Sequence, residues 1–411
     1  MLLKQNKIVL LTSGQPTLNP RLVKEADALI SAGYEVTVIY QFWNEWATKY
    51  DTDLLSKKNW KAIRVGGSPK TDKFLFWKTR VKHKIFRTIN KLISVKLFPE
   101  LSIGRCSHQL YKKAISIPAD IYIAHNLPAL PAAFKAAKKR KVKCGFDAED
   151  FHRFENSDLP GHHTVKLNSL IENKYIPKID YITAASNLIS YQYQKLYDRP
   201  VQTILNVFPK TKFAYRKHAD KHITELFWFS QTVGQNRGIE EVVLAIADLP
   251  AHNFKLNLLG ELTANDHEYF CRFFTKNNIN KKLVKFHQTI ADSEIIGFAS
   301  KYDIGLATET GRPFNRDICL TNKIFTYNQA GLAILATDTT AQKDLLSRYP
   351  NMGLIYKRND LEDLKHKLLC YLDANILENT KNHSYNYGQD MLNWETESQK
   401  FLAVIKKTLS N

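Results

Sequence analysis

An arginine in a glycine-containing loop is the strongest candidate for chemistry in this 411-residue chain. Residues 226–230 are typical of a short strand, and the loop after it holds Gly234, Arg237 and Gly238 before a helical pattern begins. Free backbone N–H groups at such a helix start, together with a guanidinium, would bind a phosphate group. An ordinary solvated loop with a surface arginine has the same pattern, so this loop alone leaves both interpretations open.

A second candidate lies in residues 320–331, LTNKIFTYNQAG. Thr321 or Asn322 suits the N-cap of a short helix, and Gly331 stands where that helix must end. Lys323 then falls in the first turn, where the helix dipole also attracts an anion. The segment predicts a second phosphate contact, although an ordinary capped helix would look the same.

The elements that must position these residues alternate between short β-rich runs and longer helical patterns, which is typical of parallel α/β domains. The runs predict strands at residues 7–11, 34–40, 121–124, 145–147, 181–184, 226–230, 254–259, 283–287, 304–307 and 333–337. A helix is expected over residues 20–32, and a polar, basic connector at 209–221 interrupts the pattern. We therefore expect an α/β fold of two tandem Rossmann-like domains, 1–205 and 206–389, that face a central cleft. A last helix at about 390–411 is expected to pack back on the first domain.

Composition excludes several classes of protein. A content of 44% hydrophobic residues is too high for intrinsic disorder. The five cysteines are far apart and include no CxxC pair, so neither a disulfide framework nor a zinc site is expected. No segment approaches the roughly 18 to 20 apolar residues that span a bilayer, and the apolar run at residues 8–11 is too short for a signal peptide. These features predict a cytoplasmic protein.

The formal net charge of +19 is concentrated in the first half of the chain. Residues 1–200 hold 33 Lys/Arg and 17 Asp/Glu, whereas residues 201–411 hold 26 and 23. Such an excess favours an anionic partner, either nucleic acid, an anionic membrane surface or a phosphorylated ligand. A basic run at residues 138–143 resembles a nuclear localisation signal, but its place between a helix and a strand favours a solvated loop.

Residues 73–99 contain eight Lys/Arg and no acidic residue. Trp77, Val81 and Ile85 follow at helical spacing, and Ile89 and Leu92 extend the same face. A basic stripe runs beside that face and consists of Arg80, Lys84, Arg87 and Lys91. An amphipathic, basic and aromatic helix is typical of a segment that lies in a membrane interface. A core-packed helix with a solvated basic face is the alternative interpretation.

Taken in order, these elements resemble the retaining, family-4-type glycosyltransferases of the GT-B fold. The pair Arg237-Gly238 matches that family's basic residue before a glycine, and NKIFTY at 322–327, continuing to Gly331 and the ATD at 336–338, matches its later motif. Further pieces match in family order at residues 32–38, 119–126, 181–188, 284–290 and 394–395. The resemblance therefore spans nearly the whole chain.

The resemblance implies transfer of a sugar from a nucleotide-sugar, with retention of configuration, to a membrane-associated, lipid-linked glycan acceptor in cell-surface polysaccharide synthesis. In that interpretation Arg237 and Lys323 hold the diphosphate and stabilise the leaving group, so no metal or other cofactor is needed. The enzyme would be cytoplasmic and peripherally bound to the inner face of the membrane. The implied donor-binding residues are Gly14, Gln231, Gly238, Phe286, Gln288, Glu309, Asn322 and Thr326.

The chain also departs from the family pattern. Relatives carry two glutamates eight positions apart, but here Thr326 replaces the second and Glu309 is the nearest candidate for the first. A threonine would offer the ribose a neutral hydrogen bond in place of a charge-assisted one. Gln231 likewise stands where relatives often have Arg or Lys. These differences leave the base and the sugar of the donor open.

The first domain contributes its own candidates. Glu149 and Asp150 follow the strand at 145–147 and are predicted to be catalytic, although carboxylates after a strand also cap helices. Arg21, His125 and Arg153 are predicted on the acceptor side, with a structural role as the alternative for His125.

Three other functions remain open from the sequence: a basic nucleic-acid-binding protein, a non-catalytic nucleotide-sugar-binding protein and a GT-B-type sugar-nucleotide epimerase. No helix-turn-helix, RNP, KH or zinc-finger pattern supports nucleic-acid binding.

Overall fold

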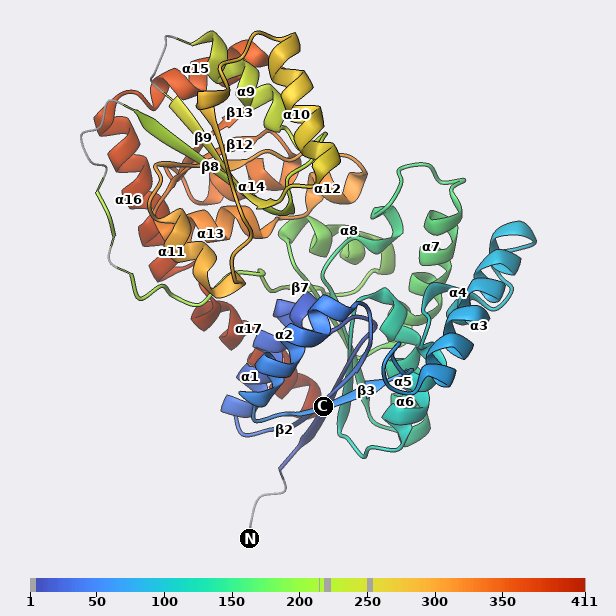
Figure 1. Cartoon of the computed structure of the whole chain (residues 1–411). Coiled ribbons are helices and arrows are strands. Elements are labelled where there is room, and N and C mark those ends of the chain that lie inside the picture. Colours follow the sequence, from blue (N-terminus) through green and yellow to red (C-terminus); the bar gives the residue numbers. More distant parts are fainter. Residues whose placement is uncertain (1–4, 214, 218–222, 250–253, 411) are drawn as a thin grey trace. The chain divides into compact units, whose positions relative to one another are not determined.

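The computed structural model describes residues 5–213, 215–217, 223–249 and 254–410, and it divides into two compact α/β units (Figure 1). The first unit comprises Met1–Leu205, Pro313–Asn315 and Ser398–Asn411, and the second comprises Asn206–Arg312 and Arg316–Glu397. The first unbroken segment thus ends at residue 205, where the sequence places its domain boundary. Of the expected connector, residues 214 and 218–221 lie outside the described part of the chain.

The first unit is built on a seven-stranded parallel sheet in the order β3-β2-β1-β4-β5-β6-β7. Its strands are β1 (Lys7–Thr12), β2 (Glu35–Gln41), β3 (Lys61–Val65), β4 (Ile121–His125), β5 (Lys143–Ala148), β6 (Tyr181–Ala184) and β7 (Gln202–Thr203). Its helices are α1 (Pro20–Ser31), α2 (Glu45–Ser56), α3 (Lys73–Leu92), α4 (Pro99–Ile103), α5 (Ser107–Ile115), α6 (Leu130–Arg140), α7 (His163–Tyr175) and α8 (Asn187–Tyr197). The central strands β1 and β4 are almost wholly buried, as expected for a sheet covered on both faces.

The second unit contains a six-stranded parallel sheet in the order β10-β9-β8-β11-β12-β13. Its strands are β8 (Thr224–Thr232), β9 (Phe254–Glu261), β10 (Val284–His287), β11 (Ile304–Ala307), β12 (Ala333–Thr337) and β13 (Gly353–Tyr356). The remaining helices are α9 (Ile239–Asp248), α10 (Ala264–Lys276), α11 (Ile295–Ala299), α12 (Phe314–Ile318), α13 (Asn322–Ala330), α14 (Thr340–Arg348), α15 (Leu361–Cys370), α16 (Ala374–Asp390) and α17 (Trp394–Ser410). An apolar cluster with Trp228, Leu256 and Leu306 among its members lies in the core of this unit.

The predicted α/β class with two Rossmann-like domains is confirmed. Every strand that the sequence predicts is present, with small differences in its bounds, and β3, β7 and β13 are additional. The basic run at 138–143 is not a loop, because Lys138–Arg140 form the last turn of α6 and Lys143 begins β5. No helix in the described residues is long and apolar enough to cross a membrane.

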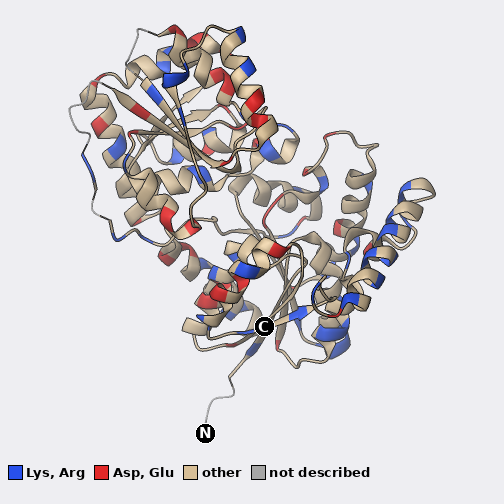
Figure 2. Cartoon of the chain, in the orientation of Figure 1, with Lys and Arg blue, Asp and Glu red and all other residues tan. Residues whose placement is uncertain are grey.

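Helix α3 exposes the apolar side chains that the sequence assigns to one face. Trp77 is 58% exposed, Val81 55% and Ile85 51%, whereas Phe76, Thr79 and Asn90 are buried against the rest of the unit. The core-packed alternative is therefore wrong for the Trp77 face. Lysine and arginine residues follow the same helix (Figure 2).

Candidate functional site

The order of strands in the second sheet singles out the gap between β8 and β11. These two neighbours pair in parallel, but β9 lies on the far side of β8 and β12 on the far side of β11. The connections after β8 and β11 therefore leave the sheet in opposite directions, which opens a crevice at the carboxyl ends of the strands where such sheets bind ligands. Arg237 follows β8, and Thr308 and Glu309 follow β11.

The loop after β8 is fixed against β11 by close packing and two hydrogen bonds. Gly238 has φ +77°, and a Cβ there would lie 2.7 Å from the Cβ of Thr308, so this position requires glycine on both counts. The Thr308 hydroxyl donates to the Arg237 carbonyl oxygen over 2.7 Å. The Trp228 indole N–H in turn donates to the Thr308 hydroxyl over 3.0 Å. The backbone at Arg237 is thus held to the core of the unit.

The Arg237 side chain lies over the end of β8 and is open to solvent. Its guanidinium donates to the hydroxyl oxygens of Ser230, over 3.1 Å, and Thr232, over 3.2 Å. These neutral contacts orient the guanidinium and leave its positive charge without an ion pair in the described residues. An oxyanion at this edge of the sheet would be its natural partner.

Lys323 reaches the same edge from the first turn of α13. Its ammonium lies 2.9 Å from Oε1 of Glu309 and 5.5 Å from the centre of the Trp228 ring. The Thr321 hydroxyl donates to the same carboxylate oxygen over 3.0 Å and does not cap the helix. The first N–H groups of α13 are therefore not capped by the N-cap side chain, and they point where an anion would be attracted.

Helix α13 can approach β11 closely because Gly305 has no side chain. A Cβ at Gly305 would lie 2.2 Å from the ring of Tyr327, whose hydroxyl donates to the Leu306 carbonyl oxygen over 2.9 Å. This contact determines how closely α13 packs on the sheet and therefore where Lys323 lies.

The other residues predicted to bind the donor occupy different surroundings. Gln231 is exposed near the end of β8, and Asn322 accepts a hydrogen bond from Asn206 over 3.1 Å. Thr326 is almost fully buried in α13, and its predicted ribose contact stays a prediction. Phe286 packs on Phe270 and Gln288 is exposed, both at the outer strand β10. Gly14 follows β1 in the first unit.

The first unit contains a buried polar cluster at the carboxyl ends of β4 and β5. His125 lies 3.2 Å from Glu25, 3.5 Å from Asp147 and 3.3 Å from Glu149. The Arg21 guanidinium donates to both oxygens of Asp147, one of them over 2.7 Å, and to the Ile204 carbonyl oxygen, and it forms an ion pair with Glu25 over 3.3 Å. Arg21 is thus a buried ion-pair residue, and its predicted place on the acceptor side stays a prediction.

In this cluster two cations, Arg21 and His125, face three carboxylates, Glu25, Asp147 and Glu149, and burial raises the pKa of Glu25. Burial alone would lower the pKa of His125, but attraction from Glu25 and hydrogen bonds with Glu149 and Glu25 raise it to about 10. Glu25, His125 and Asp147 are grouped closely enough to ligate a cation, yet the Arg21 guanidinium already donates to Asp147 and forms an ion pair with Glu25. The imidazolium of His125 and the guanidinium of Arg21 therefore supply the positive charge, and His125 is suited to holding Glu149 in place.

The predicted catalytic carboxylates of the first unit differ in their surroundings. Glu149 is partly exposed and accepts a hydrogen bond from Asn19 over 2.6 Å. Asp150 accepts one from Asn315 over 2.7 Å, and burial raises its pKa. The Arg153 guanidinium donates to Glu172 over 2.7 Å and also to Tyr197 and Asn173, so its N–H groups already have partners.

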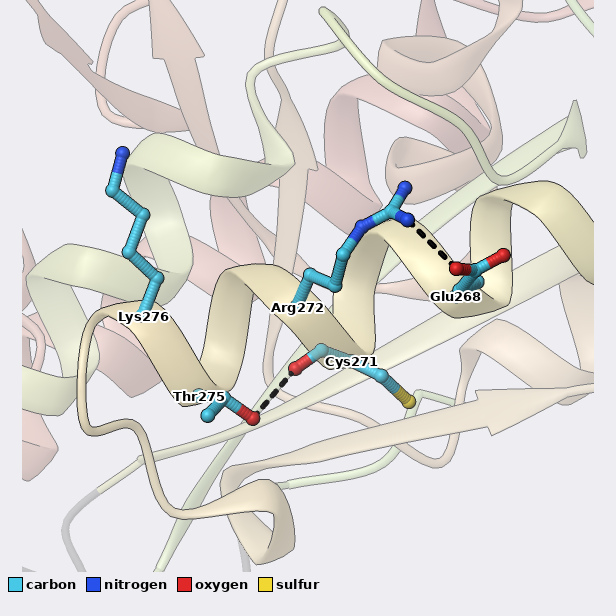
Figure 3. A pocket seen from close by; sticks show the side chains of 5 residues that line it. All are labelled: Glu268, Cys271, Arg272, Thr275 and Lys276. Carbon is cyan, nitrogen blue, oxygen red and sulfur yellow. Dashed lines mark hydrogen bonds and ion pairs between the residues drawn. The ribbon is translucent and has the colours of Figure 1, made fainter.

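A shallow pocket on α10 lies apart from all these residues (Figure 3). Arg272 donates to Glu268 over 2.7 Å, and the Thr275 hydroxyl donates to the Cys271 carbonyl oxygen over 3.0 Å. The lining side chains all come from one exposed helix and bond among themselves. The pocket therefore contributes no candidate site.

Comparison with known proteins supports the fold. No protein-family model matches the sequence, and no curated protein matches it. Sucrose-phosphate synthase of Thermosynechococcus elongatus is 11% identical with a TM-score of 0.69, over 99% of this chain and 100% of that one. The chain has the GT-B fold. HepE of Anabaena, solved with UDP and glucose, is 13% identical with a TM-score of 0.68, over 98% of this chain and 100% of that one. The lipopolysaccharide outer core galactosyltransferase WaaB is 11% identical with a TM-score of 0.62, over 98% and 99%.

In this GT-B chain the sequence reasoning missed three residues that organise the second-unit edge. Trp228 and Thr308 link the two loops described above, and Arg358 follows β13 and ties neighbouring loops together. The Arg358 guanidinium donates to Asp338 over 2.8 Å and to the Thr310 carbonyl oxygen over 3.2 Å. A tryptophan in the middle of a predicted strand is the one signal of this group visible in the sequence.

Proposed function

We propose that the protein is a glycosyltransferase that takes a sugar from a nucleotide-sugar. The observation that carries this proposal is the convergence of Arg237, Lys323 and the start of α13 at the β8–β11 crevice. Two cations and a set of helix N–H groups match the negative charge of a diphosphate. The binding of UDP and glucose by HepE, a neighbour in fold, supports the same kind of ligand.

In the proposed reaction the bond between the anomeric carbon and the diphosphate oxygen breaks, and the nucleoside diphosphate leaves with the electron pair. An acceptor hydroxyl forms the new glycosidic bond to the anomeric carbon, and its proton passes to the departing phosphate oxygen. Arg237 and Lys323 stabilise the negative charge that grows on the leaving diphosphate, which is the largest single contribution that a preorganised site makes. Lys323 is held by Glu309 in the free protein, so the donor phosphate would share or displace that contact. Because two cations are already in place, we propose that no metal or other cofactor is needed. Retention of the sugar's configuration is proposed from the resemblance of the sequence to retaining glycosyltransferases.

The acceptor is proposed to be a lipid-linked glycan at an anionic membrane surface, in cell-surface polysaccharide synthesis. Support comes from the exposed Trp77 face of α3 and the basic stripe beside it, which suit an interfacial helix on the inner face of a membrane. The guanidinium of Arg80 also lies 5.7 Å from the Trp77 ring, so charge and apolar surface are presented together. The fold neighbour WaaB acts in the lipopolysaccharide outer core, which is consistent with such an acceptor.

The first test is a panel of UDP-, GDP- and dTDP-sugars, scored by thermal shift, because a true ligand stabilises only the folded protein. The stabilising donor, labelled in its sugar, is then incubated with a membrane lipid extract, and NMR of the product compares its anomeric configuration with that of the donor. Label in the lipid fraction is the expected result.

The alternatives give different outcomes in the same assays. An epimerised sugar formed from the donor alone would establish the epimerase. Donor binding without transfer would favour a non-catalytic protein. Salt-sensitive binding to duplex DNA or RNA, with no response to any nucleotide-sugar, would overturn the enzyme proposal.

A further inference from the structure

One buried side chain touches the supports of both proposed phosphate-binding cations. Trp228, at 1% exposure, lies in β8, with Lys323 over its ring at 5.5 Å. Its indole N–H donates to Thr308. Tyr327 and Tyr371 in the same unit each donate a hydroxyl to a backbone carbonyl oxygen, whereas Trp228 combines a hydrogen bond to a side chain with a contact to a cation.

The hydrogen bonds from Trp228 have a fixed direction. An indole N–H can only donate, so the Thr308 hydroxyl must accept from it. The single proton of that hydroxyl is then left for the Arg237 carbonyl oxygen, 2.7 Å away. The chain therefore runs from Trp228 through Thr308 to Arg237, and removing either donor leaves a buried acceptor without its partner.

The ring of Trp228 acts on the second cation. An ammonium about 6 Å or less from an indole face is attracted by its quadrupole, most strongly where water is excluded. Lys323 is mostly buried and also paired with Glu309. The ring thus keeps the Lys323 ammonium in place even when a phosphate replaces Glu309 as its partner.

We propose that Trp228 is a positioning residue that sets both Arg237, through Thr308, and Lys323, through its ring. This inference rests on the proposed function, since it assigns the two cations to the donor diphosphate. It predicts that the effects of Trp228 and Thr308 on donor affinity act through Arg237 and Lys323, and not through the general stability of the core.

The test is a set of double-mutant cycles, with the Kd of the best-binding compound among UDP, GDP and dTDP measured by calorimetry. Thr308→Val removes both hydrogen bonds of the chain, Trp228→Phe removes the one that orients the Thr308 hydroxyl, and each variant is expected to raise the Kd about tenfold. Thr308→Ser keeps the hydroxyl and is expected to lose less affinity than Thr308→Val. The double variant Trp228→Phe/Thr308→Val should be no weaker than either single one, because both break the same chain.

A cycle with Arg237→Ala separates positioning from a merely structural role. In the Arg237→Ala background, Thr308→Val should have almost no further effect on the Kd. Trp228→Leu also removes the ring from Lys323 and should weaken binding more than Trp228→Phe, but only while Lys323 is present.

Some results would overturn the inference while leaving the proposed function intact. They are an unchanged Kd in Thr308→Val and Trp228→Phe, or the same loss from Thr308→Val with and without Arg237. Thermal unfolding of each variant is followed alongside, and Trp228→Phe, the mildest change, decides the matter if Thr308→Val does not fold. Failure of the wild-type chain to bind any of the three nucleotides would refute the proposed function itself.

Discussion

Neutralising the basic stripe of α3 should release the protein from anionic membranes. The variant carries Arg80→Gln, Lys84→Gln and Arg87→Gln, three exposed positions of one helix in a segment without acidic residues. Each basic residue near an anionic leaflet contributes about 1 kcal/mol, so the triple change should cost about 3 kcal/mol of binding free energy. That corresponds to a partition coefficient lower by roughly 150-fold.

The assay is sedimentation with vesicles of phosphatidylcholine and phosphatidylglycerol in equal parts, compared with phosphatidylcholine alone. The matched control is Lys138→Gln, Lys139→Gln and Lys141→Gln, which removes the same charge from exposed positions at the end of α6. This control should bind like the wild-type protein. High salt should abolish most of the wild-type binding, since screening shortens the range of the charges to about 3 Å at 1 M.

A second variant separates the apolar contribution from the charge. Trp77→Ser with Ile85→Ser keeps every basic residue of α3 but removes two exposed apolar side chains. We expect it to lose the binding that remains at high salt. Equal loss in the α3 and α6 charge variants, or unchanged binding in the α3 variant, would refute the reasoning and reduce α3 to a solvated basic helix.

Three further predictions concern stability and the donor site. The folded pKa of His125, about 10, lies above its usual value, so the stability that His125 contributes is complete below about pH 6.5 and lost as the pH rises to about 10. The difference in unfolding free energy between wild type and His125→Gln should therefore shrink over that range in denaturant titrations. Burial lowers the pKa of Lys24 to about 7, but the opposite effect of Lys24 is present in both proteins and cancels in the comparison. A constant difference would contradict the ion pairs of His125. Gly238→Ala should lower the free energy of unfolding by about 1 to 3 kcal/mol, because alanine is strained in the left-handed backbone at this position, and it should raise the nucleotide Kd. Normal affinity in calorimetry would contradict the inference that this loop is fixed for binding. Gly305→Ala should destabilise the protein by about 1 to 3 kcal/mol, because the added methyl group would clash with the Tyr327 ring. An unchanged melting temperature would show that this contact does not determine the position of α13.

The sequence predicts the fold well because its signals are local. Apolar runs and glycine or N-cap positions mark most strands and the ends of α13. The strands that it misses lie at sheet edges. In β3 two charged residues interrupt the apolar ones, β7 is only two polar residues long, and the apolar part of β13 is three residues after a glycine. The apolar pattern of these strands is too short to identify them.

The sequence predicts the site less completely because much of it depends on contacts between distant residues. The loop and cap patterns indicate Arg237 and Lys323, but nothing local shows that Trp228 supports both. The burial of Arg21 follows from Asp147, which lies 126 positions away. Thr326 is enclosed because Tyr327 pulls α13 onto β11, a packing effect that no motif carries.

The most direct test of the central claim is calorimetric titration of UDP, GDP and dTDP into the wild-type chain and three variants. Arg237→Ala and Lys323→Ala remove the proposed phosphate contacts, and Arg272→Ala removes an exposed arginine of α10 in the same unit as a matched control. The account predicts one site for one of these nucleotides in the wild type and in Arg272→Ala, with binding lost in the other two variants, which should remain folded. Equal affinity in all four proteins, or no binding to any, would contradict it.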